Sequence, residues 1–280
     1  TYTEASYVSS EVNLLAPHIM GSGLPLSMAS QTGDVDNEGN YLYVVNNDGT
    51  MGVFITNRAE KVMAWTKFIT DGSIEDVAVV EDVVYLFVRR TWGGSTKNFI
   101  EALDNQHFTD SSVRKSQSSS ATVTGLNHLD GKECRFRANS LATAGGGRTN
   151  TVMANVTPSS GSIVANRVVT DVEVGINFDV TIKTMPASVT MDTGPVSVKK
   201  RRISRVSAQL HKSSGLKING KAVPTKQLGA NILGQAPEVF TGIKTLPILG
   251  YSKTAQVTIT QTDPLPLTLL GLTVELQVTG

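Results

Sequence analysis

The sequence contains a single cysteine, Cys134, among its 280 residues, so it cannot form an intramolecular disulfide framework or a thiolate metal cage. No apolar run approaches the roughly 18 residues that a membrane-spanning helix needs. Charged residues make up only 18% of the chain, against roughly 25% in an average domain. No run rich in Ala, Glu, Lys, Leu and Arg stands out, which argues against coiled coils and helical solenoids. Because disulfides and a thiolate metal cage are excluded, the stability of the fold must come from packing or assembly.

The spacings that metal and nucleotide chemistry require are also missing. No two of the four histidines lie three or four residues apart, so there is no helical zinc signature; they are His18, His107, His128 and His211. The glycine-rich stretch 21–23 lacks a strand-to-helix context, and no Gly-Lys-Ser/Thr phosphate loop occurs. A nucleophile pair of Cys134 and His128 remains an alternative. A lone cysteine in a predicted strand is more typical of a buried, inert residue. We therefore expect no enzyme, no cofactor and no metal site.

The best cation candidate is the stretch Asp34–Asn40. It places oxygen-bearing side chains at its first, third and fifth positions and glycine at its sixth, as a calcium loop does. The twelfth position is Val45, where such a loop has a bidentate glutamate. An acidic surface turn is therefore the favoured interpretation.

The small net charge of +1 hides an asymmetry along the chain. Residues 1–110 contain 6 Lys/Arg against 15 Asp/Glu, a net charge of −9, whereas residues 111–280 contain 19 against 9, a net charge of +10. Opposite charges on segments of this size suggest two modules, of which the basic one can face a polyanion or an acidic neighbour. Separate solvation of each half is the alternative.

Short runs rich in β-branched and aromatic residues alternate with turn residues throughout the chain. In the first half the expected strands are 41–45, 51–56, 62–68, 74–80, 83–89 and 99–103, and those up to residue 89 are expected to form one up-and-down sheet. The Asp48-Gly49 pair suits a tight hairpin turn. Both parities of Val83–Arg89 are apolar, which predicts a strand covered on both faces. We expect an acidic β-meander module, propeller-like or sandwich-like, over residues 1–110.

The polar stretch 111–121, which ends in the serine-rich run 116–120, is interpreted as a linker. Beyond it, strand-length segments bounded by Gly, Asn or Pro continue, and residues 122–280 are expected to form basic β-barrel or β-sandwich modules. Val198–Leu210 combines a helical spacing of apolar residues with many β-branched residues, and we favour a strand. The predicted class is all-β. Because the chain starts at Thr1 without an initiator Met or a basic-then-apolar leader, we expect it to be part of a longer protein.

The densest charge feature is a basic cluster formed by Lys199, Lys200, Arg201, Arg202 and Arg205. Such a cluster would bind phosphates in a salt-sensitive and sequence-independent manner. No aromatic residue is interleaved with it, so base stacking is not indicated. A subunit interface, a DNA-facing surface and a solvated strand face remain alternatives.

Ordered segments over nearly the whole chain carry a family resemblance. They include the segment 11–19 with its Leu-Leu-Ala-Pro-His-Ile run, Asn-Asp-Gly-Thr at 47–50, and the segments 57–65, 70–79, 99–103, 123–131, 241–244, 249–251 and 263–271. In this order and spacing they resemble the tail tube or nozzle proteins of short-tailed bacteriophages, also called stabilisation or tail-hub proteins. Each segment alone is only a turn-and-strand signature, and the resemblance rests on their order.

The resemblance implies a structural protein of the phage tail. Several β-modules would form a ring, commonly six-fold, which conducts the double-stranded genome during ejection without sequence specificity. The ring would anchor other tail proteins, on the adaptor or portal side or as fibres or spikes, and could contact the host cell surface; no small-molecule substrate is implied. It also implies a virion location after assembly in the host cytoplasm, where a chain without disulfides is at no disadvantage. The opposite charges of the two halves would suit a heterologous contact that closes into such a ring.

A β-rich receptor-binding or glycan-binding module of a virion is the alternative. Two loops would serve it, Ala144–Gly147 and Trp92–Ser95. Trp92, which two glycines follow, could stack on a sugar ring. A hairpin tip or a subunit contact explains the same residues.

Overall fold

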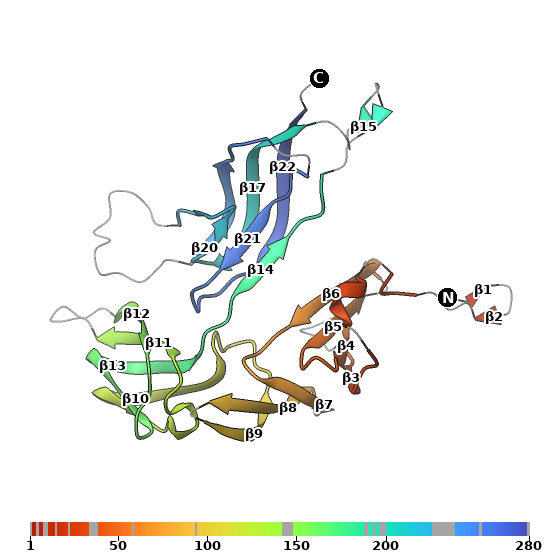
Figure 1. Ribbon diagram of the computed structural model, residues 1–280. Coiled ribbons are helices and arrows are strands. Elements are labelled where there is room, and N and C mark those ends of the chain that lie inside the picture. The colour runs from red at the N-terminus through yellow and green to blue at the C-terminus, as the bar shows by residue number, and fades with distance from the viewer. Residues whose placement is uncertain are drawn as a thin grey trace. The chain divides into compact units, whose positions relative to one another are not determined.

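A computed structural model describes residues 2–3, 6–7, 11–14, 16–21, 23–33, 39–57, 59–92, 94–141, 148–187, 190–191, 194–195, 200–225, 239–251 and 254–278 (Figure 1). The described chain is almost entirely β-structure, in antiparallel sheets, with two short 3₁₀ helices, so the predicted all-β class is confirmed. No helix in these ranges is long and apolar enough to cross a membrane. The chain divides into two compact units, unit 1 (Thr1–Gln106) and unit 2 (His107–Gly280).

Unit 1 is a meander that folds into two main sheets. The first sheet has the order β3-β4-β5-β6 and the second the order β7-β8-β9, while β1 and β2 form a separate pair. The elements are β1 (Tyr2–Thr3), β2 (Ser6–Tyr7), η1 (Pro17–Ile19), β3 (Ser27–Gln31), β4 (Asn40–Val45), β5 (Met51–Asn57), β6 (Val62–Phe68), β7 (Ser73–Val80), β8 (Val83–Trp92) and β9 (Ser95–Ala102).

The predicted single up-and-down sheet is wrong, because the meander breaks between β6 and β7. The break lets the apolar face of each sheet pack on the other. Val45 and Met51 of the first sheet share a core with Ile74 and Val88 of the second, and all four side chains are completely buried. Removal of this apolar surface from water favours two packed layers over one flat sheet.

The turns form where the sequence places residues that tolerate a left-handed backbone. Gly49 has φ of 78° in the turn between β4 and β5, and a Cβ there would lie 2.6 Å from the Ser73 hydroxyl. Only glycine fits this position without strain. The turn between β7 and β8 uses Glu81 and Asp82 at φ of 48° and 64°, the two positive values that a two-residue hairpin turn of type I′ requires.

Unit 2 begins with a four-stranded sheet of order β10-β13-β11-β12. Its elements are β10 (Asp110–Thr124), η2 (Asn127–Leu129), β11 (Cys134–Leu141), β12 (Arg148–Val156) and β13 (Ser162–Ile176). The predicted linker 111–121 is therefore wrong, since these residues lie within β10. Register shifts near Ser120 adjust its pairing with β13, and Ser116 donates a hydrogen bond to Asp171 at 2.6 Å. Pairing with a long partner strand satisfies the backbone here, which the polar composition of the segment could not reveal.

The rest of unit 2 is a sandwich of two sheets, β20-β17-β22 and β14-β21-β18-β19 (Figure 1), and β15 and β16 form a separate two-stranded pair. The strands are β14 (Val180–Lys183), β15 (Thr190–Met191), β16 (Gly194–Pro195), β17 (Arg201–Ser213), β18 (Lys217–Ile218), β19 (Lys221–Ala222), β20 (Phe240–Pro247), β21 (Thr258–Gln261) and β22 (Leu269–Val278). Val206, Ala208 and Leu210 of β17 point into one core with Ile218 and Ile259 of the other sheet. The strand favoured for Val198–Leu210 is thus confirmed from Arg201 onward.

Candidate functional site

The basic cluster does not form one continuous surface on the structure. Lys199 lies outside the described residues, and Lys200 is exposed just before β17. Arg201 is only 4% exposed, and its Nη1 donates a hydrogen bond to the carbonyl oxygen of Ala187. Arg201 is therefore part of the interior of the sandwich, and it is not available to a partner surface.

Arg202 and Arg205 both lie on the outer side of β17, although strict alternation would place residues three apart on opposite faces. A register shift between Ile203 and Arg205 in the pairing with β22 inserts one extra residue, so both arginines face outward. The Arg202 guanidinium lies 5.8 Å from the ring centroid of the exposed Tyr251. Arg205 faces Glu275 at 3.8 Å, and both side chains are more than half exposed, so this ion pair adds little stability.

A shallow pocket of about 190 Å³ lies beside Arg201. Among its lining residues are Ile203, Asn219, Ile248, Tyr251 and Gln256. Asn219 Oδ1 accepts a hydrogen bond from the Thr258 amide at 2.8 Å, and Gln256 Nε2 donates to the Thr184 carbonyl oxygen at 2.9 Å. These amides hold loops together, and the pocket brings no nucleophile and base into contact among the residues that are described.

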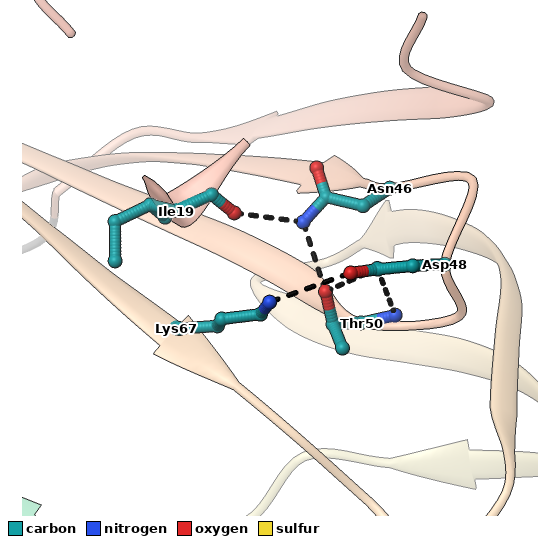
Figure 2. A network of polar contacts seen from close by, with 5 residues as sticks. All are labelled: Ile19, Asn46, Asp48, Thr50 and Lys67. Carbon is teal, nitrogen blue, oxygen red and sulfur yellow. Dashed lines mark hydrogen bonds and ion pairs between the residues drawn. The ribbon is translucent and has the colours of Figure 1, made fainter. Parts of the chain in front are cut away.

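A second set of polar residues connects the segment around Ile19 to the β4-β5 hairpin of unit 1 by hydrogen bonds (Figure 2). Asn46 is buried, and its Nδ2 donates to the Ile19 carbonyl oxygen at 2.9 Å and to Thr50 Oγ1 at 3.0 Å. Asp48 accepts hydrogen bonds from the Thr50 amide at 3.0 Å and the Thr50 hydroxyl at 2.5 Å, and Lys67 Nζ lies 3.4 Å from its other oxygen. The Thr50 hydroxyl, followed by the Thr50 amide, lowers the pKa of Asp48 below its usual range.

Trp65 completes this contact from strand β6. Its indole Nε1 donates to the carbonyl oxygen of Val12 at 3.2 Å, and its ring lies 4.8 Å from that of Phe54. A Cβ at Gly52 would lie 3.2 Å from Ile19 and 3.4 Å from the Trp65 ring. Three segments distant in the sequence, near residues 12–19, 46–52 and 65–67, are thus held together in unit 1. The sequence offered these segments only as separate signatures.

The outward face of the β7-β8-β9 sheet is a further surface that sequence reasoning missed. Val84, Leu86 and Val88 are buried, but the alternate residues Val83, Tyr85 and Phe87 are each more than a third exposed. The prediction that this strand is covered on both faces is therefore wrong for the described residues of this chain. The sequence indicated this surface, because the residues on both faces of the strand are apolar. A single chain does not show what covers the face that bears Val83, Tyr85 and Phe87.

Two further ion pairs each have one buried member, Arg90 in the first and Glu173 in the second. Arg90 is fully buried and contacts Glu101 through Nε at 2.8 Å and Nη2 at 2.6 Å. Glu173 accepts hydrogen bonds from the Phe108 amide at 2.6 Å and the Thr109 hydroxyl at 2.9 Å, and Arg137 lies 3.3 Å away. Each charge is paired and hydrogen-bonded, which is the usual requirement for a buried structural group.

The remaining candidates from the sequence take structural places or fall outside the described residues. Cys134 is buried at the start of β11, as predicted, and burial raises its pKa to about 11. His128 has a ring nitrogen 3.1 Å from the carbonyl oxygen of Ser111. Trp92 stacks on Phe99 with centroids 5.8 Å apart. Residues 34–38 of the acidic turn, Gly93 and the loop Ala144–Gly147 lie outside the described ranges, within which no group of three His, Cys, Asp or Glu could hold a metal ion.

No family model matches the sequence, and no curated protein matches it significantly. Among solved structures, an exo-β-1,3-galactanase from Phanerochaete chrysosporium, determined with galactose, aligns with 89% of this chain at 12% identity and a TM-score of 0.21. BuGH86 in complex with neoagarooctaose aligns with 77% at 13% identity and a TM-score of 0.20. This chain spans 56% and 35% of the two proteins, respectively. Scores this low do not indicate a shared fold and carry no functional argument.

Proposed function

We propose that the chain is a structural component of a bacteriophage tail. In this proposal several copies form a ring-shaped nozzle or tube that conducts the genome during ejection and anchors other tail proteins. The ring acts after assembly in the host cytoplasm, as part of the virion. The role requires stiff β-modules and extensive subunit contacts, and no substrate turnover.

The observation that carries the proposal is the contact among the segments that resemble the family. The segment 11–19, the turn 47–50 and the segment 57–65 were recognised separately in the sequence. Asn46, beside the turn, donates to the Ile19 carbonyl oxygen (Figure 2), and Trp65 donates to the Val12 carbonyl oxygen. Successive strands of any meander pair in this way, but the described residues of 11–19 form no strand of the sheet and are nevertheless held against it. Their contact supports the interpretation that they belong to a single inherited module.

The charges support a role in assembly. Unit 1 carries the acidic surplus and unit 2 the basic surplus of the chain. In this proposal Lys200, Arg202 and Arg205, on the outer side of unit 2, help to hold adjacent subunits together. A DNA-lining role is the competing interpretation. It is less favoured because each neutralised phosphate adds affinity that must be broken as the genome passes.

Electron microscopy of the purified chain tests the proposal directly. We expect rings with a central channel and, from the family resemblance, six-fold symmetry. A chain that remains monomeric at high concentration, or that forms assemblies without a channel, would overturn it.

A pair of double variants separates assembly from DNA binding. Lys200→Gln with Arg202→Gln removes one exposed charge and the half-buried guanidinium beside Tyr251, and we expect it to weaken assembly at near-physiological salt. Lys183→Gln with Lys212→Gln removes two exposed charges elsewhere in unit 2 and serves as the matched control. If the first variant assembles like the parent while its binding of duplex DNA collapses, the interface role of these residues is wrong and the DNA-lining role is favoured.

A further inference from the structure

The outward face of the β7-β8-β9 sheet carries an apolar patch that crosses all three strands. Strand register places Val80 beside Val83, and places Phe87 between Asp76 on β7 and Ile100 on β9. The row of side chains between these two consists of Tyr85, with Ala78 on β7 and Ala102 on β9 as its neighbours. The exposed fractions are 76% for Ile100, 55% for Val80, 38% for Phe87, and 37% for both Tyr85 and Val83. These five side chains are called the sheet patch below.

An antiparallel sheet with one solvated face normally presents polar residues on that face. Here the solvated face bears two aromatic and three β-branched residues as cross-strand neighbours. Apolar residues scattered singly over a surface need no explanation, but a contiguous exposed patch marks an interaction site. The sheet patch is therefore a contact surface that a single chain leaves open.

Acidic residues lie along the β7 edge of the sheet patch. Glu81 and Asp82 form the turn that joins Val80 to Val83, and both are exposed. Asp76 is the exposed cross-strand partner of Phe87 on β7. The basic residue of this face, Arg89, is already engaged by Glu75 at 2.8 Å. This edge of the patch is thus acidic, which favours a partner that brings positive charge with its apolar surface.

We propose that the sheet patch receives the basic unit 2 of a second copy of this chain, centred on Arg202 and Tyr251. Unit 2 supplies the required charge, and Tyr251 is more than half exposed with the Arg202 guanidinium 5.8 Å from its ring. Tyr and Arg are the residues that most often dominate the centres of protein interfaces. The contact is heterologous, because unit 1 of one copy meets unit 2 of the next, and it rests on the proposed function, whose subunit contact it specifies.

The first experiment places a charge in the sheet patch. Ile100→Lys changes the most exposed member of the patch, so folding should be retained. We expect self-association of the full chain to weaken by about tenfold or more, because the lysine would be buried without a partner in the contact. Met63→Lys, at a position 69% exposed on β6, is the matched control and should associate like the parent in sedimentation equilibrium. Equal association of both variants and the parent would overturn the proposal.

A mixing experiment tests whether the contact is heterologous. Ile100→Lys blocks the patch and Arg202→Glu blocks the opposing surface, so each variant alone should associate about tenfold or more weakly than the parent. An equal mixture should form heterodimers, since each pair of unlike copies retains one intact patch and one intact Arg202 surface. If Arg202→Glu assembles like the parent, the patch contacts another occupant, such as its own equivalent in a second copy, and the proposal is wrong.

The outcomes also separate this inference from the proposed function. Rings that still form with Ile100→Lys would overturn the role of the patch and leave the tail role intact. Association through the patch into particles without a channel would retain the contact and overturn the tail role. A monomeric parent whose patch is protected from hydrogen exchange by its own unit 2 would overturn the second-copy contact.

Discussion

Replacement of Arg90 by methionine should destabilise unit 1 strongly. The guanidinium is fully buried and makes two hydrogen bonds with Glu101, at 2.8 and 2.6 Å, and a third with the carbonyl oxygen of Asp71 at 2.6 Å. Methionine fills much of the same volume but leaves the Glu101 carboxylate, which is only 18% exposed, without its counter-ion. Loss of one partner of a buried ion pair costs about 3–5 kcal/mol, and we expect Arg90→Met to lose about this much.

The chain provides its own assay for this change. Both of its tryptophans, Trp65 and Trp92, lie in unit 1, so tryptophan fluorescence during urea denaturation follows the unfolding of that unit. The free energy of unfolding is obtained by linear extrapolation to zero urea. Arg89→Met is the matched control, because the neighbouring Arg89 is exposed and its ion pair with Glu75 lies at the surface. The control should cost less than about 1 kcal/mol.

A double variant tests the reason for the loss. Arg90→Met with Glu101→Leu removes both charges, so no carboxylate is left unpaired, and apolar replacements of buried ion pairs are often close to neutral. We therefore expect the double variant to be more stable than Arg90→Met alone. A cost below about 1 kcal/mol for the single variant, or an equal loss in single and double variants, would refute the argument that an unpaired buried charge causes the destabilisation.

Two further predictions concern groups with shifted pKa values. Burial raises the pKa of Cys134 to about 11, so at pH 7 only about one thiol in ten thousand is ionised. A thiol reagent should therefore label Cys134 slowly in the folded chain. Labelling as fast as that of the chain unfolded in urea would contradict the burial. The stabilising contribution of its neutral thiol should be lost as the pH rises toward that value. The lowered pKa of Asp48 implies the opposite direction, since its contribution is present above the ordinary carboxyl pKa of about 4 and is lost as the pH falls through the folded value. Asp48→Asn should therefore be less stable than the parent near pH 7, with a difference that shrinks in acid, and a difference that stays constant from pH 7 to pH 3 would refute this.

Local sequence patterns were sufficient to predict strands and turns where the partner of a segment is its neighbour in the sequence. The segment 62–68 was predicted with the bounds that β6 has, and the Asp48-Gly49 pair marked the turn before β5, because turn residues and alternation act within a few positions. The burial of Cys134 followed from its parity with Phe136 and Ala138 in one strand, all of which are buried.

Distant partners decided the rest. The serine-rich segment 111–121 resembles a linker in isolation, and it becomes part of β10 because β13 supplies its backbone with hydrogen-bond partners. The basic cluster was treated as one surface, but a register shift beside Arg205 and the burial of Arg201 divide it between the outside and the interior. The spacing of Ile203 and Val206, which resembles a helical period, reflects the bulge, but the position of a bulge and the burial of Arg201 depend on what lies opposite them.

The sequence by itself determined the all-β class, most strands of the meander, the turn residues and the opposite charges of the two halves, because these depend on side-chain type and short-range spacing. The tertiary structure alone decided that the meander divides into two packed sheets, that Arg90 is buried against Glu101, and that the apolar face bearing Tyr85 and Phe87 is left exposed. Burial depends on which surfaces meet in three dimensions. A strand that is apolar on both faces needs both faces covered, and the described residues of the folded chain cover one of them.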